Sequence, residues 1–165
     1  MKHRLDALRE RVAAAGCDAF VSVHPPANQY LSGFLTSLDH VSSAIVLTPS
    51  EAYFLCDSRY TEQARGQVRE FRVDQITGDQ LQRAGELLKG LGIKRAAFDP
   101  NGHTVAEHAR LAAGFGGELV PQESLVSELR MRKETLESDA IREASRLAEG
   151  VLRDVLPELR EGVAE

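Results

Sequence analysis

Two histidines and a glutamate within residues 103–108 have the residue types of a metallopeptidase helix. A zinc-binding helix places its histidines four positions apart, so that both face the same side. His103 and His108 are five positions apart, which turns them by about 140° relative to each other on a helix. Thr104 and Glu107 also form the pattern of a capping box, which places His103 before the first helical turn. We therefore predict a cap and a surface position for His103, and no zinc site.

The sequence lacks several other patterns that carry chemistry. It has no glycine-rich phosphate loop, no Gly-x-Ser-x-Gly nucleophile elbow and no Cys-x-x-Cys pair. Asp18, Asp57 and Asp99 flank predicted strands, where three carboxylates could in principle gather around a metal ion. Acidic residues at strand ends more often cap helices and form turns, and we favour this interpretation for the three aspartates.

The most specific string in the chain is residues 28–34, Asn-Gln-Tyr-Leu-Ser-Gly-Phe. Asn28 is expected to cap a short turn, Tyr30 to pack on the sheet, and Gly33 to allow a sharp exit into residues 35–40. Polar side chains in such a loop, Asp39 and His40 among them, make it a reasonable place for function. A simple connector is the alternative, and the residues alone leave both open.

A second polar string, residues 57–60, lies where a buried strand is expected to run into a helix. In one interpretation Asp57 caps that helix while Arg59 and Tyr60 pack locally. In the other, the strand end presents polar groups at a cleft or an interface. We favour the first interpretation.

The elements that must position these strings alternate between helix and strand. The apolar spacing predicts helices at residues 3–15, 60–68, 79–91, 104–113 and 135–156, and strands at 19–23, 43–48, 52–56, 71–76, 96–98 and 118–120. Strands separated by helices predict an α/β fold, and the short link at residues 49–51 predicts an antiparallel hairpin that makes the sheet mixed. The composition changes after residue 130, so we predict one domain at 1–130 and the start of a second at 131–165.

Composition and charge narrow the class of protein. The chain has 165 residues, 42% of them hydrophobic, which argues against disorder, and no apolar run is long enough to cross a membrane. A net charge of −5 without a basic block disfavours nucleic acid as a partner. Cys17 and Cys56 stand in apolar settings without a signal peptide, so we expect two reduced, buried thiols in a cytoplasmic protein.

These strings together resemble a known family. Asn28-x-Tyr30-Leu31-x-Gly33-Phe34, the hairpin and residues 57–64 are similar to the N-terminal domain of the creatinase/prolidase/aminopeptidase P family. Residues 129–144 resemble the junction into the "pita-bread" catalytic domain of that family, and residues 159–165 resemble a turn before the second helix of that domain. The resemblance covers the whole chain. It implies a mixed, roughly six-stranded sheet flanked by helices in an RNase H-like arrangement, followed by the first long helix of the catalytic domain.

The resemblance also implies a function for the whole enzyme. The family cleaves Xaa–Pro peptides with two divalent cations, Mn²⁺ or Co²⁺, whose ligands would lie beyond residue 165. This chain would then be inactive alone and would serve as a substrate-gating and dimerisation domain, active as a homodimer on proline-containing peptides. Asn28, Tyr30, Asp39 and His40 would approach the substrate of the partner subunit.

Two other functions fit the same strings. One is a non-catalytic interaction module of the same fold, as in a eukaryotic histone chaperone subunit whose peptidase-like part has lost its metal ligands. The other is a creatinase-like domain for C–N hydrolysis. The residues that would distinguish these two functions from a peptidase lie outside the strings that carry the resemblance.

Overall fold

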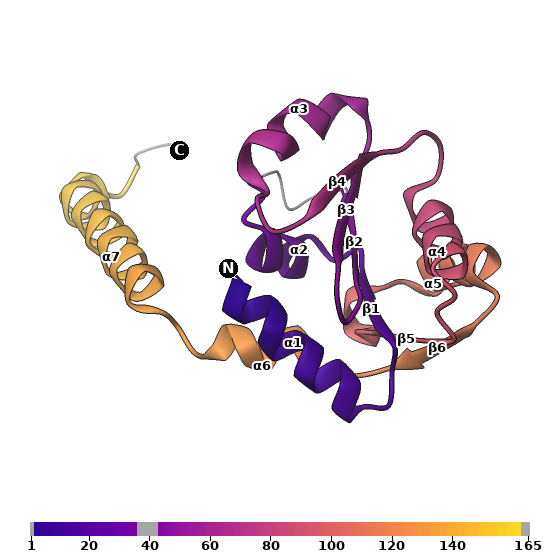
Figure 1. Ribbon diagram of the computed structural model, residues 1–165. Helices are drawn as coiled ribbons and strands as arrows, with labels where there is room; N and C mark the ends of the chain where they lie inside the picture. Colours follow the sequence, from indigo (N-terminus) through magenta and orange to yellow (C-terminus); the bar gives the residue numbers. More distant parts are fainter. Residues whose placement is uncertain (1, 36–42, 163–165) are drawn as a thin grey trace. The chain divides into compact units, whose positions relative to one another are not determined.

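The computed structural model of the protein describes residues 2–35 and 43–162. Its chain divides into two compact units, Met1–Arg130 and Met131–Glu165. The first unit holds a sheet with helices on both faces (Figure 1). The second unit is built around a single long helix.

The sheet of the first unit has six strands in the order β4-β3-β2-β1-β5-β6. These are β1 (Ala19–Ser22), β2 (Ser43–Leu47), β3 (Ala52–Cys56), β4 (Arg72–Gln75), β5 (Arg95–Phe98) and β6 (Glu118–Pro121). β2 runs antiparallel to both β1 and β3, while β1 pairs with β5, β3 with β4 and β5 with β6 in parallel. The predicted hairpin and the mixed six-stranded sheet are therefore confirmed.

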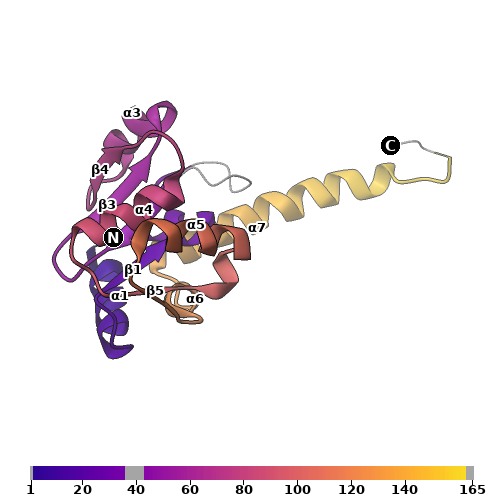
Figure 2. The same ribbon diagram turned by 90° about the vertical axis from the view of Figure 1, so that its right-hand side faces the viewer.

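Helices cover both faces of this sheet, as the two perpendicular views show (Figures 1 and 2). On one face lie α1 (Lys2–Ala14), α2 (Pro25–Ser32), α3 (Ser58–Gln67) and α6 (Leu125–Met131). On the other face lie α4 (Gln80–Gly90) and α5 (Val105–Phe115), with a short 3-10 turn at Pro100–Gly102 before α5. Because helices pack on both sides, β1, β2 and β3 are buried along their whole length.

Successive residues of the central strands serve two separate apolar layers. Phe20 and Phe54 point into the layer beneath α1, α2 and α3, whereas Val21 and Leu55 point into the layer beneath α4 and α5. All four side chains are buried. Continuous apolar runs in these strands follow from burial on both faces.

The helices α4 and α5 approach each other closely because glycines stand at their contact. A Cβ atom on Gly85 of α4 would overlap the backbone oxygen of Leu111, and one on Gly114 of α5 would overlap that of Gln82. Neither glycine has a positive φ. These glycines therefore provide space rather than conformational freedom, and they set the distance between the two helix backbones.

Several predicted helix boundaries are confirmed by their caps. Asp57 accepts a hydrogen bond from the backbone N–H of Arg59, and Asp79 accepts from those of Leu81 and Gln82. The capping box at the start of α5 is also present. The side chains of Asp57, Asp79 and Thr104 accept hydrogen bonds from backbone N–H groups that have no partner within the first turn of each helix.

Two short helices were missed by the sequence analysis. Pro25 and Pro26, which follow β1, occupy the first two positions of α2, where a missing N–H costs nothing. His24, not Asn28, is the N-cap residue of this helix. Asn28 lies in the middle of α2, so the prediction that it caps a turn is wrong. α6 is only seven residues long and offers too little periodicity to detect.

The second unit contains α7 (Thr135–Val155), followed by a 3-10 turn at Leu156–Glu158. The helix was predicted at 135–156, and its large apolar side chains are exposed. They are Leu136, Ile141, Leu147, Val151, Leu152 and Val155. Among the described residues no helix combines the length and the apolarity that a membrane span requires.

Candidate functional site

Residues 35–40, which follow Phe34, were predicted from the sequence to be a place for function. Asp39 and His40 fall within residues 36–42 and lie outside the described residues. The structure does describe the residues on both sides of this segment. They form two anchors, which we call the loop frame: Phe34 and Leu35 with their contacts on one side, Ser43 and Asn28 on the other.

The first anchor is an aromatic cluster beneath α3. Phe34 is 1% exposed, and its ring packs edge-on against Phe54 at 5.0 Å and Tyr60 at 6.0 Å between centroids. Edge-to-face pairs of this kind add to the free energy gained from burial. The position of Phe34 is thus fixed by residues of both β3 and α3.

Two glutamines of α3 hold the backbone of the next residue. Gln63 donates from Nε2 to the carbonyl oxygen of Leu35 at 2.7 Å, and the N–H of Leu35 donates to Oε1 of Gln67 at 3.0 Å. The Leu35 side chain itself is 61% exposed. The chain therefore leaves the core at Leu35 with its main chain bonded and its side chain directed away from the core.

The second anchor is Asn28, whose side chain reaches from α2 to the first residue of β2. Its Nδ2 donates to the carbonyl oxygen of Ser43 at 2.9 Å and lies 3.2 Å from the Ser43 hydroxyl oxygen. Asn28 is only 2% exposed, and its Oδ1 has no hydrogen-bond partner among the described residues. A buried, bonded amide of this kind positions the backbone. Asn28 therefore fixes where the loop rejoins the sheet.

The turn from α2 to Phe34 depends on Gly33. It has a φ of 74° and ends α2 in the left-handed conformation, with its N–H donating to the carbonyl oxygen of Gln29 at 2.8 Å. Ser32 supports the same turn, since its hydroxyl donates to the Asn28 carbonyl at 2.6 Å and accepts from the Phe34 N–H at 3.1 Å. The predicted sharp exit at Gly33 is confirmed.

Tyr30 is half-buried on the outer side of α2. The Arg4 guanidinium stacks on its ring, 4.3 Å from the centroid, and Nη1 of Arg4 donates to the Tyr30 carbonyl oxygen at 2.9 Å. Part of the ring packs on the core, in agreement with the expected contact with the sheet. Tyr30 is thereby held at the surface of the first unit, tied to α1.

The polar string at 57–60 caps α3 and packs locally, and Asp57 and Arg59 also line a pocket. Asp57 caps α3 and also accepts from Nη2 of Arg59 at 2.6 Å. This hydrogen bond with Arg59 lowers the pKa of Asp57, although partial burial opposes the shift. Tyr60 packs on Phe34. The interpretation as a cap with local packing is confirmed.

His103 lies outside the helix as predicted, and its side chain is half-buried. Its Nδ1 is 3.0 Å from the carbonyl oxygen of Asp99, and its ring packs edge-on against Phe98 at 5.5 Å. Its Nε2 is buried without a hydrogen-bond partner among the described residues. Burial lowers the pKa of His103, and it also lowers the pKa of His24 at the end of β1. The contact with Phe98 was not predicted, because nothing in the local sequence signals it.

The lowered pKa values predict that the fold loses stability in mild acid. The lowered pKa values make protonation of His103 and His24 less favourable in the folded state, whereas the unfolded chain takes up protons at the ordinary histidine pKa of about 6.5. Stability from these groups is therefore complete above that pH and is lost as the pH falls below it. We expect a lower urea midpoint at pH 5.5 than at pH 7.5. The variant His103→Gln should show a smaller difference between the two values, and an equal difference would contradict the assignment.

The three aspartates considered as a metal site do not come together. Asp18 precedes β1 and accepts from the N–H groups of Lys94 and Arg95 at 3.1 and 2.9 Å. Asp57 and Asp99 follow β3 and β5, at the opposite end of the sheet. In residues 2–35 and 43–162 no three His, Cys, Asp or Glu side chains are placed to hold a metal ion. The resemblance places the ligands of its dinuclear centre beyond residue 165, so these three aspartates are not its candidates.

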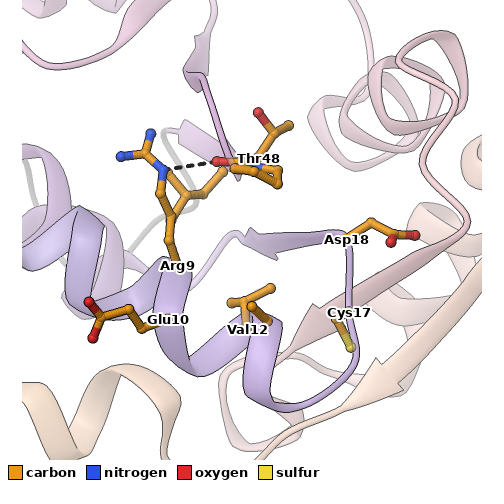
Figure 3. A pocket seen from close by; sticks show the side chains of 9 residues that line it. Arg9, Glu10, Val12, Cys17, Asp18 and Thr48 are labelled. Atoms are coloured by element: carbon orange, nitrogen blue, oxygen red, sulfur yellow. Dashed lines mark hydrogen bonds between the residues drawn. The ribbon is translucent and has the colours of Figure 1, made fainter.

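One pocket was not anticipated from the sequence. It measures about 270 Å³ between the end of α1, the start of β1 and the end of β2, where Nε of Arg9 donates to the carbonyl oxygen of Thr48 at 2.9 Å (Figure 3). Cys17 lies in its wall, 8% exposed, and burial raises the pKa of this thiol. Cys56 is also free and buried, as predicted. No set of polar groups converges in the pocket, so it suggests no reaction.

Comparison with known proteins identifies the class. Residues 4–132 match the sequence profile of the Creatinase/Prolidase N-terminal domain. The chain therefore belongs to the creatinase/prolidase family and contains its N-terminal domain. It is 30% identical over 163 residues to a peptidase of Bacillus subtilis (strain 168), YqhT, whose function is uncharacterised. That alignment covers 98% of this chain and 45% of YqhT, so the chain spans less than half the length of this curated relative.

Solved structures agree with this assignment. An Xaa-Pro dipeptidase from Bacillus anthracis superposes with a TM-score of 0.90 over 99% of this chain and 45% of its own, at 24% identity, which shows the fold. The N-terminal domain of the cytoplasmic peptidase PepQ from Mycobacterium tuberculosis matches with a TM-score of 0.69 and 27% identity, over 77% of this chain and 98% of its own. These relatives are named as peptidases, and the Mycobacterium tuberculosis structure is the N-terminal domain of one.

Proposed function

We propose that this chain is the substrate-gating and dimerisation domain of a proline-specific metallopeptidase, an Xaa-Pro aminopeptidase or dipeptidase. The observation that carries the proposal is the loop frame. Phe34 and Ser43 are both held in buried contacts, and the sequence between them includes the polar residues Asp39 and His40. Loops fixed at both ends by a rigid scaffold are common places for binding residues.

In this proposal the residues have two different roles. Asp39, His40 and Tyr30 approach the substrate bound by the partner subunit, and the Asp39 carboxylate pairs with the free α-amino group of the peptide. Asn28 acts through its hydrogen bonds to Ser43 and is a positioning residue. Peptide cleavage itself belongs to a catalytic domain with two divalent cations, Mn²⁺ or Co²⁺, so residues 1–165 alone are inactive. The buried free thiols agree with a cytoplasmic location.

The proposal is tested by Asp39→Ala in an enzyme that carries this chain together with its catalytic domain. Loss of an amino-terminal ion pair should change the ratio of kcat/KM for an Xaa-Pro dipeptide to that for an Xaa-Pro tripeptide by about tenfold or more, because charged hydrogen bonds contribute roughly 1.5–3 kcal/mol. Glu62→Ala is the control, since Glu62 lies on α3 with a side chain that is 95% exposed. A ratio that stays the same in Asp39→Ala would disprove the gating role.

A further inference from the structure

The strand β4 forms one edge of the sheet. In the part of the chain that the structure describes, β4 pairs with β3 and with no second strand. The N–H of Ile76 donates to the carbonyl oxygen of Cys56 at 2.8 Å. Because polar groups alternate along a strand, Asp74 and Arg72 also direct their backbone toward β3, while Val73 and Gln75 direct theirs to the open edge. β4 can therefore accept another strand.

Charge along this edge is self-complementary. Arg72 and Asp74 lie on the same face of β4, with Nε of Arg72 3.2 Å from Oδ1 of Asp74, and Val73 lies between them on the other face. The side chains of Arg72 and Asp74 are 69% and 34% exposed. When two copies of the segment Arg72–Asp74 run antiparallel, Arg72 of each copy lies opposite Asp74 of the other. An antiparallel copy of the same strand thus matches it.

We propose that β4 pairs with β4 of a second copy of this chain about a twofold axis at Val73, joining two sheets into one. Val73 then faces Val73 of the other copy as a hydrogen-bonded pair, using the N–H and C=O groups that point outward. Arg72 faces Asp74 of the other copy twice, at the closely spaced positions between hydrogen bonds. The inference rests on the dimerisation part of the proposed function and names its surface.

The surroundings of β4 fit this partner on both faces. On the face of Arg72 and Asp74, a groove of about 670 Å³ runs between β4 and α4 and is lined by Arg83 and Glu86, which leaves room for the charged side chains of the other copy. On the opposite face Val73 packs against the core and is only half-buried, so a second Val73 would extend the apolar layer. A peptide of arbitrary sequence would match neither the charges nor the valine, which favours a second copy as the occupant.

The test reverses the charges of the edge and measures association by sedimentation velocity over a range of concentrations. Arg72→Asp places acids opposite acids, and Asp74→Arg places bases opposite bases, so each should raise the dimer Kd by about tenfold or more. The double variant Arg72→Asp/Asp74→Arg restores both pairs and should recover most of the wild-type affinity. Glu10→Arg on α1, a charge reversal of equal size on an exposed residue, should leave the Kd unchanged. Circular dichroism checks that every variant is folded.

Disulfide trapping tests the register of the two paired β4 strands independently. The hydrogen-bonded pair at Val73 has a Cα separation of about 5.5 Å, which permits a disulfide, so Val73→Cys should form covalent dimers under mild oxidation. Gln75→Cys should not, because its symmetry mate lies about 13 Å away along the strand. The native thiols Cys17 and Cys56 are buried and should not contribute to the trapped species.

The outcomes separate this inference from the proposed function. Weakened dimers in both single variants, with recovery in the double variant, support pairing through β4. A dimer that survives both single reversals, or trapping of Gln75→Cys but not Val73→Cys, overturns the β4 pairing and leaves the proposed gating and dimerisation intact. A chain that is monomeric at every concentration overturns both the pairing and the dimerisation.

Discussion

Replacement of Phe34 by alanine is expected to lower the free energy of unfolding by about 3–5 kcal/mol, the usual cost of removing a buried phenylalanine. The ring is 1% exposed and contacts the rings of Phe54 and Tyr60, so the variant loses both apolar burial and two edge-to-face pairs. A cavity would open beneath α3 at the first anchor of the loop frame. Urea denaturation followed by circular dichroism measures the loss.

Leu35→Ala is the matched control for this prediction. Leu35 is the next residue and is also a large apolar side chain, but it is 61% exposed and bonded only through its main chain. Its replacement should change the free energy of unfolding by less than about 0.5 kcal/mol. Equal losses in the two variants would contradict the assignment of Phe34 as an anchor.

Gly85→Ala is expected to destabilise the fold by about 2–3 kcal/mol, even though alanine is the better helix former. The added methyl group would overlap the backbone of α5 at Leu111, and backbone cannot move aside as a flexible side chain can. The helices α4 and α5 would have to separate, which would disturb the apolar layer between them and the sheet. A lower thermal midpoint would report this change.

The same substitution at the end of α4 should have the opposite sign. Gly90 has no atom within 4 Å of the position that a Cβ would occupy, so Gly90→Ala should stabilise the protein by about 0.5–1 kcal/mol. The pair of variants in one helix thus separates packing from helix propensity. A gain in stability at both positions would show that α4 and α5 are not in close backbone contact.

Local chemistry made much of the fold predictable from the sequence. Asp57, Asp79 and Thr104 stand at the starts of helices whose N–H groups need acceptors, and that requirement is visible in the sequence. The hairpin of β2 and β3 was predictable for a similar reason, because its partners are neighbours along the chain. The pairing of β1 with β5 was not, since it joins Ala19 to Ala96 and depends on long-range packing.

The candidate site was predicted less well, and the errors share a cause. Asn28 was expected to cap a turn because asparagine commonly does so, yet its amide bonds Ser43, fifteen residues away. His103 was expected at the surface, yet it packs on Phe98. In both cases a contact with another element overrides the local preference of the residue. The contribution of Gln63 and Gln67 was missed because only the folded backbone brings them to Leu35.

The loop frame has a consequence for how such a domain can diversify. The described contacts of Phe34 and Ser43 are made with Phe54, Tyr60 and Asn28, so we expect these contacts to tolerate changes in the sequence and length of the interval between them. Doubling the length of a flexible loop costs only about 0.6 kcal/mol of closure entropy. Relatives could thus differ in the sequence of this interval while they keep the same fold. Different substrates could then be recognised without any change in the hydrophobic core.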